Sequence, residues 1–70
     1  MNHKYSANTE RAAECQRLVE ELRPFFEELN DKEKSFVIDT DERLTKYGEG
    51  TFISDAQYDW LTNIYQRVIG

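Results

Sequence analysis

The chain has 70 residues, of which 33% are charged and 39% are hydrophobic, and its net charge is −5. A chain of this length fits one domain with a small core, because it buries only about 60% of its unfolded surface. Fourteen acidic against nine basic residues disfavour binding to nucleic-acid phosphates or anionic membranes, and suit a partner protein with a basic surface. Net charges of this size also serve solubility alone.

The single cysteine, Cys15, excludes an intramolecular disulfide and a zinc site built from thiolates, which fits a reducing compartment. No apolar run approaches the ~20 residues of a membrane span, and the start of the chain has no signal-peptide pattern. We therefore expect a cytoplasmic protein that does not contact a membrane.

The first element in chain order is a long amphipathic helix. Residues 1–8 are polar and lack periodicity, so they are predicted to fray. A helix is expected over about 9–29, because apolar residues recur there at alternating steps of three and four. Its apolar stripe suits a core, and a second copy of the chain is expected to share it, with Leu18 and Leu22 central to the dimer. The stripe comprises Ala12, Cys15, Leu18, Val19, Leu22, Phe25, Phe26 and Leu29.

Pro24 interrupts this helix, because proline removes one helical hydrogen bond and crowds the preceding turn. Either the helix kinks at Arg23–Pro24, or it ends there and Pro24 begins a short second helix. We favour the kink, since the apolar periodicity continues beyond the proline.

The second helix begins at a capping box. Asn30 and Glu33 have the spacing at which each side chain satisfies a free backbone N–H of the helix start. The helix is predicted over about 31–47, with Gly48 placed to end it and Gly50 as a second flexible position. Its inner face is expected to comprise Phe36, Val37, Thr40, Leu44 and Tyr47.

A second capping box, Ser54 and Gln57, begins the third helix, which is predicted over about 55–69. Ile53 and Tyr58 are spaced to close a hydrophobic staple over the cap. The apolar positions that follow are Trp60, Leu61, Ile64, Tyr65 and Val68.

These elements predict an all-α, three-helix bundle in one domain over residues 9–70, with the first helix kinked or split at Pro24. The short connections favour antiparallel neighbours.

Residues able to support catalysis are few. His3 is the only histidine and lies in the segment expected to fray. Asp39 and Glu42 are neighbours on a helix, yet no calcium-loop or phosphate-loop spacing accompanies them. Cys15 falls among apolar positions and is expected to fill the core. The sequence therefore predicts a protein that is not an enzyme and binds no metal or cofactor.

Glutamates gather on one flank of the first predicted helix. Five of these glutamates are candidates for contact with a basic protein surface, where their carboxylates would occupy positions that normally bind phosphates. We name these five residues the glutamate ridge. The alternative is an ordinary solvated face. The ridge comprises Glu14, Glu20, Glu21, Glu27 and Glu28.

Four Phe, four Tyr and one Trp are many aromatic residues for a small bundle to bury. Tyr58 and Trp60 are candidate partner contacts, because Trp and Tyr are enriched at binding hot spots. The alternative is that both residues belong to the core.

The pattern Leu29-Asn30-x-x-Glu33-x-x-Phe36-Val37, followed by Ile53-Ser54-x-x-Gln57-x-x-Trp60-Leu61-x-x-Ile64-Tyr65, resembles a small helical module of phage and mobile-element proteins. That module accompanies DNA-processing machinery. This chain has Ile53 where the module often has leucine, and lacks the tryptophan often found before the first glutamate. The matching residues, over about forty positions, are mostly caps and core. The resemblance therefore implies a helical hairpin and a phage-like origin, and no activity.

Together these patterns predict a non-enzymatic, small acidic protein that binds and modulates or inhibits a protein of the nucleic-acid machinery. Two alternatives come from other classes. One is an accessory protein that binds nucleic acid directly, if Lys4, Arg11, Arg17 and Arg23 converge into a basic patch despite the net charge. The other is a homodimeric structural module whose first-helix stripe pairs with itself.

Overall fold

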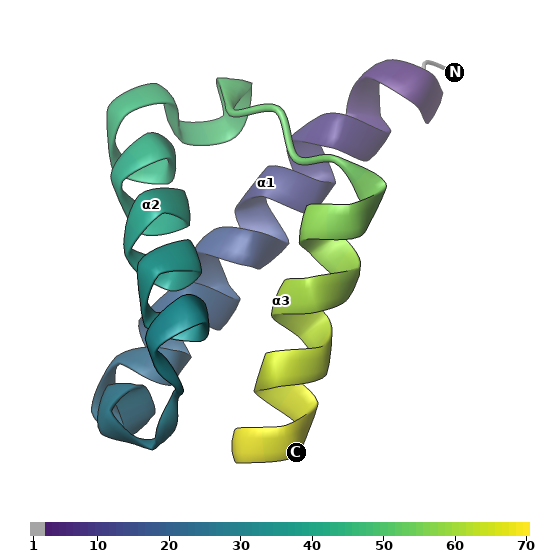
Figure 1. Ribbon diagram of the computed structural model, residues 1–70. Helices are drawn as coiled ribbons and strands as arrows, with labels where there is room; N and C mark the ends of the chain where they lie inside the picture. Colours follow the sequence, from purple (N-terminus) through teal and green to yellow (C-terminus); the bar gives the residue numbers. More distant parts are fainter. Residues whose placement is uncertain (1–2) are drawn as a thin grey trace.

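A computed structural model describes residues 3–70, with side chains described from Thr9 onward; Met1 and Asn2 lie outside the described residues. This part of the chain contains three α-helices and two short 3-10 helices, and no strand, which confirms the predicted all-α bundle (Figure 1). In chain order the elements are α1 (His3–Leu22), η1 (Arg23–Glu28), α2 (Asp31–Tyr47), η2 (Gly48–Gly50) and α3 (Asp55–Val68).

The core lies where α2 and α3, which stand side by side, both pack on α1 (Figure 1). The apolar stripe of the first predicted helix faces this core as predicted, except Phe25, which is half-buried and does not pack against the core. Leu18 and Leu22 are only 2% and 0% exposed within the single chain, so a dimer centred on them would have to open the core. The buried apolar residues are Ala12, Cys15, Leu18, Val19, Leu22, Leu29, Val37, Leu44, Ile53, Leu61 and Ile64.

The first α-helix ends at Leu22, and the favoured prediction of one kinked helix to about residue 29 is wrong. The chain continues as η1, with Pro24 in its first turn, where the missing proline N–H has no helical partner to lose. Leu22 keeps helical dihedrals, whereas Leu29 is extended with φ −87° and ψ 149° and ends η1. The tighter winding still brings Leu29 into the core.

The start of α1 also differs from the prediction, because the helix begins at His3 and not near residue 9. Ser6, Asn8 and Thr9, which are residue types that often cap helices, lie inside this helix. Intrinsic helix preferences of such residues differ from those of good helix formers by only a few tenths of a kcal/mol, so neighbouring turns outweigh them.

Both capping boxes form as predicted. At the start of α2, the Asn30 side chain accepts from the Glu33 N–H at 2.8 Å, and Glu33 accepts from the Asn30 N–H at 3.1 Å. At the start of α3, the Ser54 hydroxyl accepts from the Gln57 N–H at 3.1 Å, and Gln57 accepts from the Ser54 N–H at 2.9 Å. Spacing alone therefore located both helix starts.

The end of α2 follows the prediction at Gly48 and departs from it at Tyr47. Gly48 has φ 57° and its N–H donates to the Leu44 carbonyl, whereas Gly50 has no positive φ. Tyr47 is 58% exposed and does not join the inner face. Thr51 is buried there instead, because η2 folds the chain back and the Thr51 hydroxyl donates to the Gly48 carbonyl at 2.8 Å.

No helix in residues 3–70 combines the length and apolar character required to cross a membrane.

Candidate interaction surfaces

Two tyrosines of α3 hold two members of the glutamate ridge. The Tyr58 hydroxyl donates to Glu14 at 2.9 Å, and the Tyr65 hydroxyl donates to Glu21 at 2.5 Å. The two pairs are separated by seven residues, or two turns, on both helices. This equal spacing is possible because α1 and α3 run in the same direction. The bond from Tyr65 lowers the pKa of Glu21 and raises that of Tyr65, and the bond to Glu14 likewise raises the pKa of Tyr58.

Arg17 lies between these two glutamates on α1. Its guanidinium is 3.2 Å from Glu21 and 4.0 Å from Glu14. About half of the Arg17 side chain is exposed, and 42% of each glutamate side chain is exposed. The two carboxylates are therefore anchored by α3 and still reach solvent.

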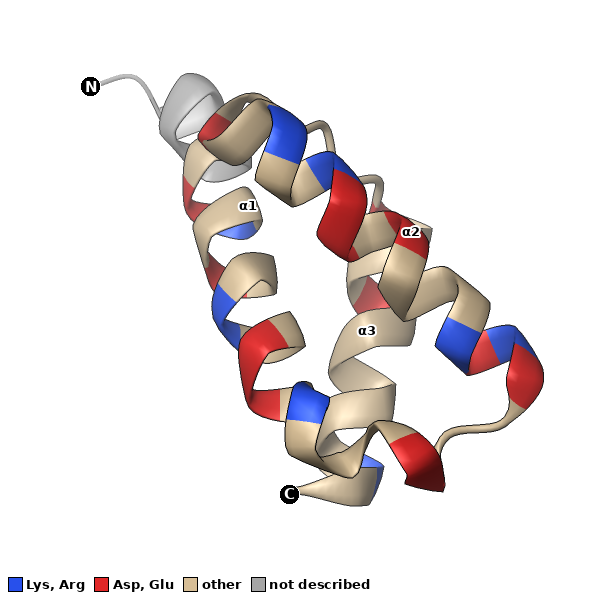
Figure 2. Ribbon diagram, turned by 90° about the vertical axis from the view of Figure 1, so that its left-hand side faces the viewer, with Lys and Arg blue, Asp and Glu red and all other residues tan. Residues whose placement is uncertain are grey.

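The other three members of the ridge are exposed. Glu27 makes an ion pair with Lys34 at 3.3 Å, whereas Glu20 and Glu28 have no such partner among the described residues. Because η1 winds more tightly than an α-helix, Glu28 does not continue the heptad position of Glu14 and Glu21. The ridge therefore consists of an α1 part and an η1 part; Figure 2 shows the acidic positions along α1.

The arginines of the alternative nucleic-acid patch are each engaged by carboxylates. Arg11 contacts Asp55 at 2.8 Å, and Arg23 contacts Asp41 at 3.1 Å. Arg17 is held by the ridge. The side chain of Lys4, like that of His3, lies outside the described residues. The three described arginines therefore form no unpaired basic patch.

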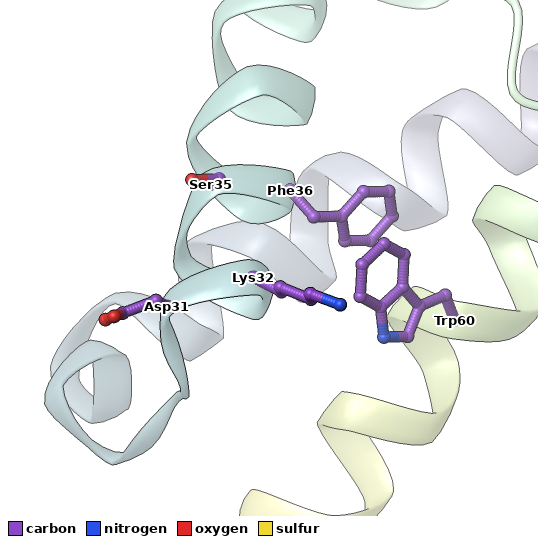
Figure 3. A pocket seen from close by; sticks show the side chains of 5 residues that line it. All are labelled: Asp31, Lys32, Ser35, Phe36 and Trp60. Atoms are coloured by element: carbon purple, nitrogen blue, oxygen red, sulfur yellow. The ribbon is translucent and has the colours of Figure 1, made fainter.

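Trp60 and Phe36 bridge α3 and α2. Their rings stack with centroids 4.2 Å apart and planes inclined by 19°, and Trp60 remains 40% exposed. We name the shallow depression beside them the aromatic pocket; Figure 3 shows the two rings between the helices and the Lys32 side chain extending toward Trp60. Tyr58 faces α1, so the two aromatic candidates are on different surfaces. The aromatic pocket is lined by Asp31, Lys32, Ser35, Phe36 and Trp60.

An ion pair that the sequence did not predict joins α2 to α3. Glu33, 5% exposed, receives two hydrogen bonds from the Arg67 guanidinium, at 2.7 Å and 2.8 Å. Chiefly through these bonds, Arg67 lowers the pKa of Glu33. The capping box marks Glu33 as a helix-start residue, but nothing local in the sequence pairs it with a residue 34 positions away.

The one thiol of the chain lies in the core. Cys15 is fully buried, and burial raises the pKa of its thiol to about 11, so the thiol is unreactive in the folded chain. Within residues 9–70, no group of three or more His, Cys, Asp or Glu side chains is arranged to hold a metal ion. In comparisons with protein-family models, curated proteins and solved structures, nothing matches this chain.

Proposed function

We propose that this chain is a non-enzymatic binding protein that docks its glutamate ridge onto the basic surface of a protein of the nucleic-acid machinery, and so modulates or inhibits it. The observation that supports this best is the anchoring of Glu14 and Glu21 by Tyr58 and Tyr65, with both carboxylates still partly exposed. Carboxylates held in place lose less conformational entropy on binding than freely rotating ones.

The distribution of arginines also supports this role. Arg11 and Arg23 make their ion pairs with Asp55 and Asp41, so neither pairs with a ridge carboxylate. Among the described residues, only Arg17 and Lys34 pair with ridge carboxylates. A surface with this surplus of negative charge accelerates encounter with a cationic partner. The resemblance to a phage module favours a target in a host cell, where such a partner normally binds nucleic-acid phosphates.

The test is affinity capture from a host lysate, followed by binding kinetics with the captured protein. A ridge variant carries Glu20→Gln, Glu27→Gln and Glu28→Gln. A matched control carries Asp39→Asn, Glu42→Gln and Glu49→Gln, which removes three exposed charges from α2 and η2.

We expect the parent and the control to retain a basic protein that the ridge variant loses or binds more slowly. Added salt should slow association of the parent, because exposed charges are screened within ~8–10 Å at physiological ionic strength. Equal capture by the ridge variant and the control, with unchanged melting temperatures, would reduce Glu20, Glu27 and Glu28 to a solvated face.

A further inference from the structure

The aromatic pocket combines a rigid exposed ring with a free cation. Phe36 covers one face of the Trp60 indole at 4.2 Å and restricts its rotation, while 40% of Trp60 remains exposed. A tryptophan fixed in this way binds an apolar group without first losing side-chain entropy. The pocket lies between the start of α2 and α3 (Figure 3).

Two hydrogen-bond donors beside the ring have no acceptor in the described part of the chain. These are the ammonium of Lys32, which extends toward Trp60, and the indole N–H of Trp60 itself. Asp31 and Ser35 also line the pocket, but Figure 3 shows them pointing to the other side of α2. The charge adjoining the exposed indole is therefore positive, although the chain as a whole is acidic.

We propose that the aromatic pocket binds a segment of a protein partner in which a carboxylate adjoins an apolar side chain. The apolar group packs on the indole of Trp60, and the carboxylate accepts from the Lys32 ammonium. A protein segment fits better than single-stranded nucleic acid, because the one cation of the pocket, Lys32, matches a single carboxylate, whereas a nucleic-acid backbone adds one negative charge with every nucleotide. Tyr58 and Tyr65, which hold the α1 part of the ridge, face α1, whereas Trp60 faces α2, so the molecule is suited to join two partners of opposite charge.

Trp60 is the only tryptophan, so its fluorescence reports directly on the pocket. The full chain is titrated with a short capped peptide of alternating leucine and aspartate, and with the same peptide carrying asparagine. We expect a saturable change in emission and about two- to fivefold tighter binding of the aspartate peptide, the range for an exposed ion pair. Added salt should reduce this preference.

The variant Lys32→Gln should lose the preference for aspartate while its melting curve stays that of the parent. Lys46→Gln is the matched control, because it removes an exposed lysine of α2 outside the pocket. Phe36→Leu should weaken both peptides, since it removes the ring behind Trp60.

Equal binding of the two peptides by the parent, or equal losses in Lys32→Gln and Lys46→Gln, would overturn the proposal. Tighter binding of an oligothymidylate than of the aspartate peptide would also overturn it, and would assign the pocket to single-stranded nucleic acid. All three results leave the ridge proposal untouched, because no variant in these experiments changes a ridge residue.

Discussion

The two capping boxes share one local chemistry and differ in what surrounds their third helical residue. At the start of α2, Glu33 is buried and also receives both bonds from Arg67 of α3. At the start of α3, Gln57 is half-buried and bonds within its own box, to Ser54. The first box is therefore part of the contact between two helices, whereas the second is a local cap. Equal motifs can thus carry very different shares of the stability of a fold.

Truncating the third residue of each box tests this difference most strongly. Glu33→Ala removes a cap and leaves Arg67 without its carboxylate, so we expect it to lower the free energy of unfolding by roughly 2–3 kcal/mol. Breaking a fully buried pair costs more, but the Arg67 guanidinium is half-exposed and regains water. Gln57→Ala should cost ~1 kcal/mol or less, since only a local bond is lost. Urea denaturation of both variants measures the gap, and equal losses would contradict a tertiary role for the first box.

The turn between the boxes allows a comparison that involves backbone alone. Gly48 has φ 57° and an added Cβ would meet nothing within 4 Å, so Gly48→Ala should cost about 1–2 kcal/mol through backbone strain. Gly50→Ala is the control, because Gly50 also has open space around it but no positive φ. Thermal melts in which both variants match the parent would show that α2 does not depend on glycine to end.

Removing the first residue of each box sharpens the comparison further. Ser54→Ala and Asn30→Ala each delete one N-cap acceptor, and each should cost about 1 kcal/mol. In Asn30→Ala, Glu33 still accepts from the residue 30 N–H and from Arg67, so the change isolates the cap from the ion pair. If Asn30→Ala lowers the free energy of unfolding as much as Glu33→Ala does in the same urea denaturation, the cap and not Arg67 accounts for the stability that the first box contributes.

Only the first box contains an ionisable side chain, Glu33, so only its contribution to stability depends on pH. This pH dependence is the smallest effect that we expect. Because Arg67 lowers the pKa of Glu33, the stabilisation by this carboxylate is complete above its ordinary pKa of about 4.3 and is lost as the pH falls through the lowered value. The melting temperature of the parent should therefore fall more steeply below about pH 4.5 than that of Glu33→Gln. Glu21, whose pKa is also lowered, contributes equally to both proteins. If the melting temperatures of the two proteins fall in parallel with pH, the ionised form of Glu33 stabilises the fold no more than a neutral side chain does.

The sequence predicted the features that depend on residues close to one another along the chain. The helix starts at Asn30 and Ser54, the turn at Gly48 and most of the core follow from caps, backbone freedom and periodicity within a few turns. The end of α1 near Pro24 was one of two alternatives and not the favoured one, because a proline fits a kink or the start of a new helix equally well.

The contacts that define the candidate surfaces were not predictable in this way. Tyr58 with Glu14, and Tyr65 with Glu21, join residues 44 positions apart, and which tyrosine meets which glutamate depends on the rotation of α3 on α1. Glutamates at heptad spacing look equally solvated whether or not a neighbouring helix reaches them. In the structure, Glu21→Lys would therefore remove a bond between helices as well as a surface charge.

The buried thiol of Cys15 equips the protein with a reporter of its own opening. Alkylation requires both access and a thiolate, and the folded chain offers neither, since the side chain is fully buried and the pKa of the thiol is raised to about 11. A reagent such as iodoacetamide can therefore react only with molecules in which α1 has lost its cover. The rate of labelling in native buffer, divided by the rate for the unfolded chain, then gives the fraction of open molecules without any denaturant.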